Sequence, residues 1–256
     1  MADWNSNKYL AFKNERTQPS IDLVESIELI NPKTIIDIGC GPGNSTQILV
    51  NKWPNSKIIG LDSSKTMIER AKNDYPNQIW IHEDAQNITD DNKYSLVFSN
   101  AALQWIDNHE KLIHNLWKIV ENNGAFACQI PNFENMPINI AINNVLNRYK
   151  WKDYIDNFWN KGGHELNYYY ELLSKYTKEL FLWETRYFHI LSSMKEIIDF
   201  LHSTALKPYL EQLNNQRDRE EFEKDILQES KKYYYEQSDG NVLFPFYRMF
   251  MIAYKK

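Results

Sequence analysis

Residues 34–46 decide the fold, and they read Thr34-Ile35-Ile36-Asp37-Ile38-Gly39-Cys40-Gly41-Pro42-Gly43-Asn44-Ser45-Thr46. A short β-branched run leads into glycines at alternate positions, which allow positive φ and let a ligand approach the backbone. Asn44 or Ser45 can then cap a helix whose first amides and dipole face the turn. The stretch predicts a buried strand that turns sharply into a helix and binds a nucleotide-like ligand at the turn.

The spacing of the glycines separates two kinds of nucleotide-binding turn. Dinucleotide folds use G-x-G-x-x-G with a pyrophosphate on the helix end, whereas this turn is G-x-G-x-G and follows Asp37. A carboxylate at that place suits an ammonium group better than a pyrophosphate. A second strand, predicted over 57–62, ends in Asp62, where a ribose diol would find an acceptor. With Asp84 at the end of a third strand, the pattern resembles that of class I S-adenosylmethionine-dependent methyltransferases.

Length and composition limit the kind of protein. A chain of 256 residues can hold one large domain or a domain with a cap, and 43% hydrophobic with 25% charged residues is ordinary for a soluble globular protein. The net charge of −5 disfavours a general nucleic-acid surface, so an anionic substrate must meet a local cluster of cations. The two cysteines form no disulfide framework and have no metal-ligand spacing with a histidine. We therefore expect a reducing, cytoplasmic compartment and no metal. The N-terminus does not read as a signal peptide, and no apolar run is long enough to span a bilayer, so we expect no membrane partner.

Strands and helices alternate along the first half of the chain. The predicted strands are 34–39, 57–62, 79–84, 94–100 and 124–130, and the predicted helices are 44–53, 64–74 and 107–121, the last capped by Asp107. Such alternation builds a parallel sheet with ligands beyond the carboxyl ends of its strands. Two late strands, 180–190 and 242–254, have helices between them. With the resemblance, the pattern predicts an α/β fold: a Rossmann-like class I methyltransferase sheet, mostly parallel, seven strands with the last antiparallel, and a helical cap.

We expect a single methyltransferase domain over 1–256. Its predicted parts are an N-terminal lid segment (about 1–30), a cofactor-binding core (31–131), helical cap insertions (132–178 and 192–240) and late strands of the sheet (179–191 and 241–255). Arg16 lies in the lid segment. It either pairs with Glu15 or Asp22 at the surface or reaches a carboxylate of a ligand.

S-adenosylmethionine carries a sulfonium, an ammonium, a carboxylate, a ribose diol and an adenine. Asp37 would meet the ammonium and Asp62 the ribose, although Asp62 could instead cap the following helix. Met67 would flank the adenine and sugar, although a helix methionine can equally be a core residue. The residues predicted to bind the cofactor are Arg16, Asp37, Gly39, Cys40, Gly41, Gly43, Asp62, Ser63, Met67, Asp84, Ala85, Asn100 and Ala101.

The acceptor side lacks an obvious Ser-His-Asp, zinc or paired-acid arrangement in the sequence. Methyl transfer needs a general base only when the acceptor atom is protonated, so this favours an acceptor that is already ionised, such as a carboxylate. Arginine forks hold carboxylates bidentately, and a buried arginine is costly without an anion. Each arginine could instead lie at an edge or on the surface. The candidate cations are Arg16, His164, Arg186, His189, Lys207 and Arg248.

Motifs along almost the whole chain are similar to those of the trans-aconitate 2-methyltransferases. They are Asp3-Trp4-Asn5, the glycine turn, Asn100-Ala101-Ala102-Leu103-Gln104-Trp105, Gln129-Ile130-Pro131, Leu206-Lys207-Pro208-Tyr209 and Phe246-Tyr247-Arg248-Met249-Phe250. Lys207 and Tyr209 stand where the family's Leu-Arg-Pro-Trp has Arg and Trp. The resemblance implies transfer of a methyl group from S-adenosylmethionine to a carboxylate of trans-aconitate or a similar small polycarboxylate, with S-adenosylhomocysteine as product. The implied substrate-binding residues are Trp4, Trp105, His164, Arg186, His189, Lys207 and Arg248, with Gln104, Trp105 and Tyr9 as positioning residues.

Other activities stay open at this point. A methyltransferase for carboxylates on an acyl carrier (the malonyl-carrier O-methyltransferase type) would want an exposed basic patch, and no strong basic run is visible. A dinucleotide-binding oxidoreductase is disfavoured by the glycine spacing. A cofactor-binding protein without activity is disfavoured by the well-populated acceptor side. We expect a monomer or weak homodimer that acts on a small molecule and binds no nucleic acid.

Overall fold

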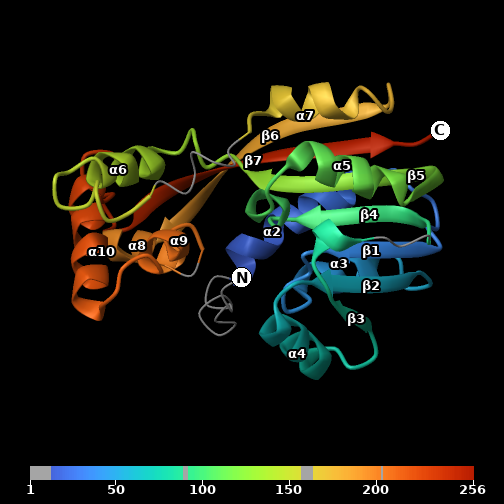
Figure 1. Ribbon diagram of the computed structural model, residues 1–256, viewed down its shortest axis with the longest axis horizontal. Helices are drawn as coiled ribbons and strands as arrows, with labels where there is room; N and C mark the ends of the chain where they lie inside the picture. Colours follow the sequence, from blue (N-terminus) through green and yellow to red (C-terminus); the bar gives the residue numbers. More distant parts are fainter. Residues whose placement is uncertain (1–12, 89–91, 157–163, 203) are drawn as a thin grey trace. The chain divides into compact units, whose positions relative to one another are not determined.

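The computed structural model describes residues 13–88, 92–156, 164–202 and 204–256, although not the side chains of residues 13–16 (Figure 1). In these residues a seven-stranded sheet has the order β3-β2-β1-β4-β5-β7-β6. The strands are β1 (Thr34–Ile38), β2 (Lys57–Asp62), β3 (Ile79–His82), β4 (Tyr94–Asn100), β5 (Val120–Pro131), β6 (Leu180–Leu191) and β7 (Val242–Tyr254). The pairs from β3 to β5 are parallel, and β7 runs antiparallel to β5. The predicted α/β sheet with its last strand antiparallel is confirmed.

Helices connect the strands as the alternation predicts. The described helices are α2 (Lys13–Glu25), α3 (Asn44–Lys52), α4 (Lys65–Asp74), η1 (Ala85–Asn87), η2 (Leu103–Trp105), α5 (His109–Lys118), α6 (Pro137–Leu146), α7 (Leu166–Leu173), α8 (Met194–His202), α9 (Lys207–Leu210) and α10 (Gln216–Ser230).

Helix α5 corrects one prediction. It begins two residues later than expected, because its cap is Asn108 rather than Asp107. The Asn108 side chain tolerates the left-handed backbone there, with φ 55°, and its Oδ1 accepts from the amide of Lys111 at 3.1 Å. The helix also ends early because β5 already begins at Val120.

The chain forms two compact units. Unit 1 comprises residues 1–131, 164–185 and 248–256, and unit 2 comprises residues 132–163 and 186–247. Residues 164–178, placed in the cap from the sequence, therefore group with the sheet. A large apolar core of unit 1 is formed where α5 and α7 pack on β4, β5 and β7 through Leu116, Leu173, Val97, Phe126 and Met251. None of the described helices is long and apolar enough to cross a membrane.

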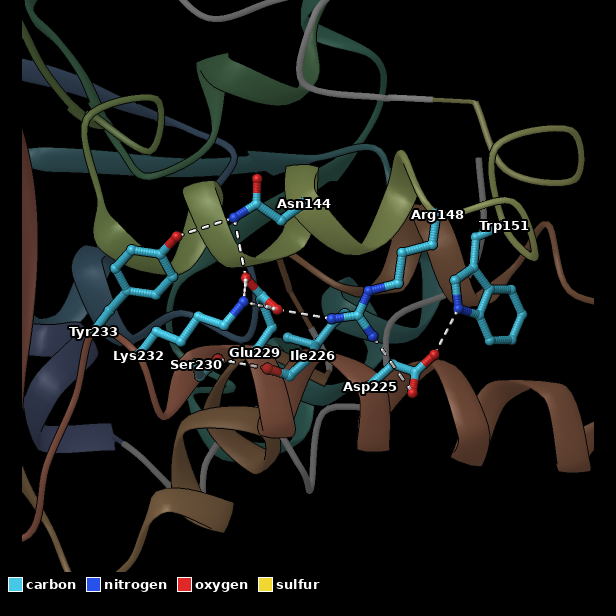
Figure 2. Close-up of polar contacts among 9 residues, drawn as sticks. All are labelled: Asn144, Arg148, Trp151, Asp225, Ile226, Glu229, Ser230, Lys232 and Tyr233. Atoms are coloured by element: carbon cyan, nitrogen blue, oxygen red, sulfur yellow. Dashed lines mark hydrogen bonds and ion pairs between the residues drawn. The ribbon is translucent and has the colours of Figure 1, made fainter.

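Unit 2 is held by a polar network between α6 and α10 (Figure 2). The Glu229 carboxylate is buried, and it accepts from Asn144 Nδ2 at 3.1 Å, Arg148 Nη2 at 2.7 Å and Lys232 Nζ at 2.7 Å. One turn earlier, Trp151 Nε1 donates to Asp225 at 2.8 Å. A buried carboxylate is tolerated because several donors replace its hydration.

Replacing Glu229 with alanine should therefore destabilise unit 2. The change leaves Asn144, Arg148 and Lys232 without their common acceptor, and we expect a loss of about 2 kcal/mol in the free energy of unfolding. The hydrogen bond from Lys232, more than the other contacts, lowers the pKa of Glu229 below its usual 4.5. The ionised Glu229 therefore contributes its full stabilisation above about pH 4.5. This contribution is lost as the pH falls through the lower pKa of Glu229 in the folded state.

Urea unfolding followed by tryptophan fluorescence measures this difference. The matched control is Glu221→Ala on the same helix, where Glu221 and Lys150 form an ion pair with side chains 45% and 43% exposed. Such a pair contributes at most about 0.5 kcal/mol. Equal losses in the two variants would show that the buried network does not hold α6 to α10.

Candidate functional site

The glycine turn of unit 1 has the backbone that the sequence predicts. Gly39, Gly41 and Gly43 have φ of 71°, 54° and 95°. A Cβ on Gly39 would lie 2.1 Å from Cβ of Ala102, so this glycine is required for packing. A Cβ on Gly41 would meet nothing within 4 Å, so the turn presents bare backbone to open space there. That is the arrangement a ligand lying along the main chain requires.

Asp37 is fully buried beneath the turn. The hydroxyls of Ser45 and Thr46 donate to its Oδ2 at 2.7 and 2.6 Å, while its buried Oδ1 has no partner in the described parts of the chain. Burial raises the pKa of Asp37 to about 6, and the two hydroxyl hydrogen bonds oppose that rise. The expected cap by Asn44 or Ser45 is wrong, because Gly43 occupies the cap position and the Ser45 hydroxyl is engaged by Asp37.

Asp62 joins the turn to the next helix. Its Oδ2 accepts from the amide of Gly41 at 2.8 Å, and its Oδ1 accepts from the amide of Ser64 at 2.8 Å. Ser64, not Asp62, is the cap residue of α4, since the Ser64 Oγ accepts from the amide of Met67. Burial raises the pKa of Asp62, and both backbone hydrogen bonds lower it. Each carboxylate oxygen can accept a second hydrogen bond, so a diol can be bound without breaking these contacts.

The other residues predicted around the cofactor differ in what they can offer. Met67 is buried, and the Cys40 side chain packs in an apolar cluster with Trp80, so only the backbone of Cys40 is left for a ligand. Asp84 Oδ1 accepts from the amide of Gln86 at 2.9 Å and so caps η1, next to the buried Ala85. The carbonyl of Ser63 lies 3.0 Å from His82 Nε2.

The turn after β4 brings a second group of polar atoms together. Ala101 has φ 53°, a strained value for alanine that costs on the order of 1 kcal/mol. Its amide donates to the Gln129 carbonyl at 2.9 Å, and its carbonyl accepts from Gln104 Nε2 at 2.8 Å. Buried oxygens of Asn100 (Oδ1) and Gln104 (Oε1) have no partner among the residues described. Trp105 ends η2 in the same turn.

Arg248 lies at this end of the sheet. Its side chain is buried in β7, and its Nη1 donates to Gln129 Oε1 on β5 at 3.1 Å. Gln129 belongs to the motif Gln129-Ile130-Pro131 singled out from the sequence, but it is not among the predicted site residues. His164 stacks on Tyr168, and its ring lies 5.1 Å from that of His109.

Three further candidate cations belong to unit 2. The exposed Arg186 lies over the rings of Phe188 and Tyr247, at 4.6 and 5.3 Å from their centroids. His189 is buried among aromatic rings of Phe200, Phe244 and Phe246. Lys207 pairs with Glu211 at 3.8 Å. Trp4, Tyr9 and the side chain of Arg16 lie outside the described residues, so their proposed roles stay predictions, as do those of the unit 2 cations.

The polar atoms of unit 1 fit a cationic nucleotide-like cofactor. Acceptors predominate around the turn: both oxygens of Asp62, Oδ1 of Asp37 and Oε1 of Gln104. Gly41 leaves its backbone open. The described residues hold no cluster of His, Cys, Asp and Glu that could bind a metal ion.

Comparisons with known proteins agree with this geometry. A family model described as "Methyltransferase domain" matches residues 36–128. The YcgJ protein from Bacillus subtilis has a similar fold, with a TM-score of 0.60 at 15% identity over 93% of this chain and 99% of that one. The plantazolicin methyltransferase BpumL, solved in complex with a pentazolic desmethylPZN analog and SAH, has a TM-score of 0.53 at 14% identity over 98% of this chain and 90% of that one. Fold and site together define a class I S-adenosylmethionine-dependent methyltransferase.

Comparison with curated sequences identifies the family within this class of methyltransferases. A protein of Escherichia coli O139:H28 (strain E24377A / ETEC) named "Trans-aconitate 2-methyltransferase" is 34% identical over 99% of this chain and 98% of its own length. A protein of the same name from Escherichia coli O45:K1 (strain S88 / ExPEC) is 33% identical over the same shares. The chain belongs to the trans-aconitate 2-methyltransferase family.

The raised pKa of Asp37 predicts a pH dependence of cofactor binding. When bound, S-adenosylmethionine supplies a methyl group activated by the positive sulfur, and its ammonium needs a negative acceptor. Asp37 is charged above its pKa of about 6 and gains a proton below it. We expect the dissociation constant to rise by about tenfold between pH 7 and pH 5, because only the ionised carboxylate stabilises the ammonium.

Calorimetric titration across this range checks the expectation. Asp37→Asn should bind weakly at every pH and lose most of the dependence, because the group with a pKa of about 6 is gone. The control Asp74→Asn, at the exposed end of α4, should keep the full slope. A wild-type affinity that does not change between these pH values would exclude Asp37 as the ammonium's charged partner.

Proposed function

We propose that this methyltransferase forms a monomethyl ester on a carboxylate of trans-aconitate or a similar small polycarboxylate. The observation that carries the proposal is the match, at 34% identity over 99% of the chain, to a protein named for that reaction. The match extends through both units and so includes the residues outside the common cofactor-binding half.

The chemistry of the site supports an ionised acceptor. A carboxylate is already a nucleophile at neutral pH, so no side chain has to remove a proton. The chain's own task is to align the acceptor oxygen with the methyl group and to exclude water. Gln104 and Trp105, in the turn after β4, are the proposed positioning residues. Arg248 is the proposed principal cation for the acceptor, because it is buried at the carboxyl end of β5 in the same unit as the glycine turn.

The remaining predicted residues complete the proposal. The candidates to bind the remaining carboxylates of the acceptor are Arg186, His189, Lys207 and His164. The acceptor site would be lined by Trp4 and Tyr9. Within the predicted lid segment, 1–30, Leu23 and Val24 of α2 are fully buried in unit 1, so only the part before α2 stays a predicted lid. We further propose that the enzyme acts in the cytoplasm as a monomer or weak homodimer, on a free small molecule rather than a nucleic acid.

A panel of acceptors tests the proposal. The purified protein is incubated with methyl-labelled S-adenosylmethionine and trans-aconitate, cis-aconitate, isocitrate or a malonyl-loaded acyl carrier protein, and base-labile label is counted. We expect the highest kcat/KM for trans-aconitate. A preference for the malonyl carrier would overturn the choice of substrate while leaving the methyltransferase class intact.

A further inference from the structure

The orientation of the Gln129 side chain is fixed by its neighbour. Arginine carries only hydrogen-bond donors, so the amide atom that faces Arg248 Nη1 must be the oxygen. The nitrogen, Nε2, is therefore the atom that is buried without a partner in the described parts of unit 1. A buried amide donor left unpaired costs free energy, and such groups call for an explanation.

Gln129, Arg248 and Asn100 share one face of the sheet. Gln129 is opposite Asn100 on β4 and opposite Phe250 on β7, and Arg248 is two residues from Phe250. Cross-strand partners, and residues two apart on a strand, point to the same face. Asp37 lies on that face too, since it is opposite Phe98 on β4. The unpaired donor of Gln129 thus lies at the ligand-binding end of the strands, on the same face of the sheet as Asp37.

The buried atoms at this end of the strands that are unpartnered within the described residues differ in polarity: those of Asp37, Asn100 and Gln104 are oxygens, and that of Gln129 is a nitrogen. Gln104 Nε2 donates to the Ala101 carbonyl, which can only accept, so the unpartnered atom of Gln104 is its oxygen. Asp37 and Gln104 therefore offer acceptors, which suit the cationic cofactor. Gln129 offers a donor beside the guanidinium of Arg248, which suits an anion.

We propose that Gln129 Nε2 and the guanidinium of Arg248 together bind one carboxylate of the acceptor, and that Gln129 is a specificity-determining residue of this enzyme. The inference rests on the proposed function for the identity of the acceptor. Gln129 acts in two ways: its oxygen holds Arg248 in place, and its nitrogen donates to the bound carboxylate. A purely structural glutamine would need only the first.

Two substitutions separate these roles. Gln129→Glu keeps the size and the acceptor for Arg248, but it replaces the donor with a negative charge. Gln129→Leu removes both hydrogen bonds. Binding of trans-aconitate to the S-adenosylhomocysteine complex is measured by calorimetry, and the KM of the acceptor is measured alongside. We expect both variants to weaken acceptor binding by about 10- to 100-fold, Gln129→Glu more strongly, with affinity for S-adenosylhomocysteine unchanged within about twofold.

The control is Ser95→Ala, which removes a buried polar group at the opposite end of β4, where Ser95 Oγ accepts from the amides of Lys33 and Thr34. It should change stability but not acceptor binding. Unchanged acceptor binding in a folded Gln129→Glu variant overturns the inference and leaves the proposed function standing. Binding of trans-aconitate that depends on Gln129 but is followed by no methylation overturns the proposed function and leaves the inference standing. No binding of trans-aconitate by the wild-type complex overturns both the inference and the choice of trans-aconitate as the acceptor.

Discussion

Replacing Asp62 with alanine is expected to weaken binding of S-adenosylmethionine by about 100- to 1000-fold, the largest effect predicted here for a single residue. Two charge-assisted hydrogen bonds to the ribose, each worth about 1.5–3 kcal/mol, would be lost. The amides of Gly41 and Ser64 would also lose the acceptor that shapes the turn. Loss of the ligand contacts and loss of the turn's shape therefore act in the same direction.

The experiment compares affinities by calorimetry with S-adenosylhomocysteine. Asp62→Asn should lie between wild type and Asp62→Ala, because an amide keeps one oxygen as an acceptor but turns a donor toward one of the two backbone amides. Asp74→Ala is the control, since Asp74 is a surface carboxylate of α4 paired with Arg70, and it should change affinity by less than about twofold. An Asp62→Ala variant with wild-type affinity would remove the ribose assignment.

Replacing Arg248 with methionine is expected to raise the KM of the acceptor by about 100-fold or more, with little change in cofactor affinity. A guanidinium that holds a carboxylate bidentately contributes about 3 kcal/mol in a buried site. Methionine fills similar space and carries no charge, so the variant also avoids leaving a cavity beside Gln129. Arg248→Lys keeps the positive charge but cannot bind a carboxylate bidentately, so it should give an intermediate KM.

The matched control is Arg70→Met, at a half-exposed position on α4, where no effect on the acceptor is expected. If Arg248→Met does not fold, Arg248→Lys still decides the question through its separate effects on KM and on cofactor affinity. Should both variants keep the wild-type KM, Arg248 is a structural residue and the acceptor's cation must be sought among the other candidate cations.

The glycine turn and the carboxylate of Asp62 beside it could be predicted from the sequence, and the contact between Gln129 and Arg248 could not. The glycine turn and Asp62 lie on two neighbouring strands whose order follows from right-handed crossovers. Gln129 and Arg248 are 119 residues apart in the sequence, and their contact depends on the register of two antiparallel strands. The sequence pattern predicts that both residues lie in strands, but it does not predict which residues of the two strands are opposite each other.

Details of the helix ends show the same limit. Ser64 caps α4, but α3 has no side-chain cap because Asp37 engages the Ser45 hydroxyl. Asp107 and Asn108 are both good cap residues, and the left-handed backbone at 108 selects the asparagine. Local propensity does not decide which of two neighbouring residues caps a helix, and the packed structure does.

The sequence by itself determined the strand–turn–helix, the alternation that builds the sheet and the class of the cofactor. Those signals lie within a few residues of one another, where backbone sterics and side-chain spacing act directly. Only the tertiary structure decided that Gly39 must be bare against Ala102, that α7 groups with the sheet, and that Gln129 turns a donor away from Arg248. These depend on contacts between segments far apart in the chain, which exist only once the strands have taken one register and the core has closed.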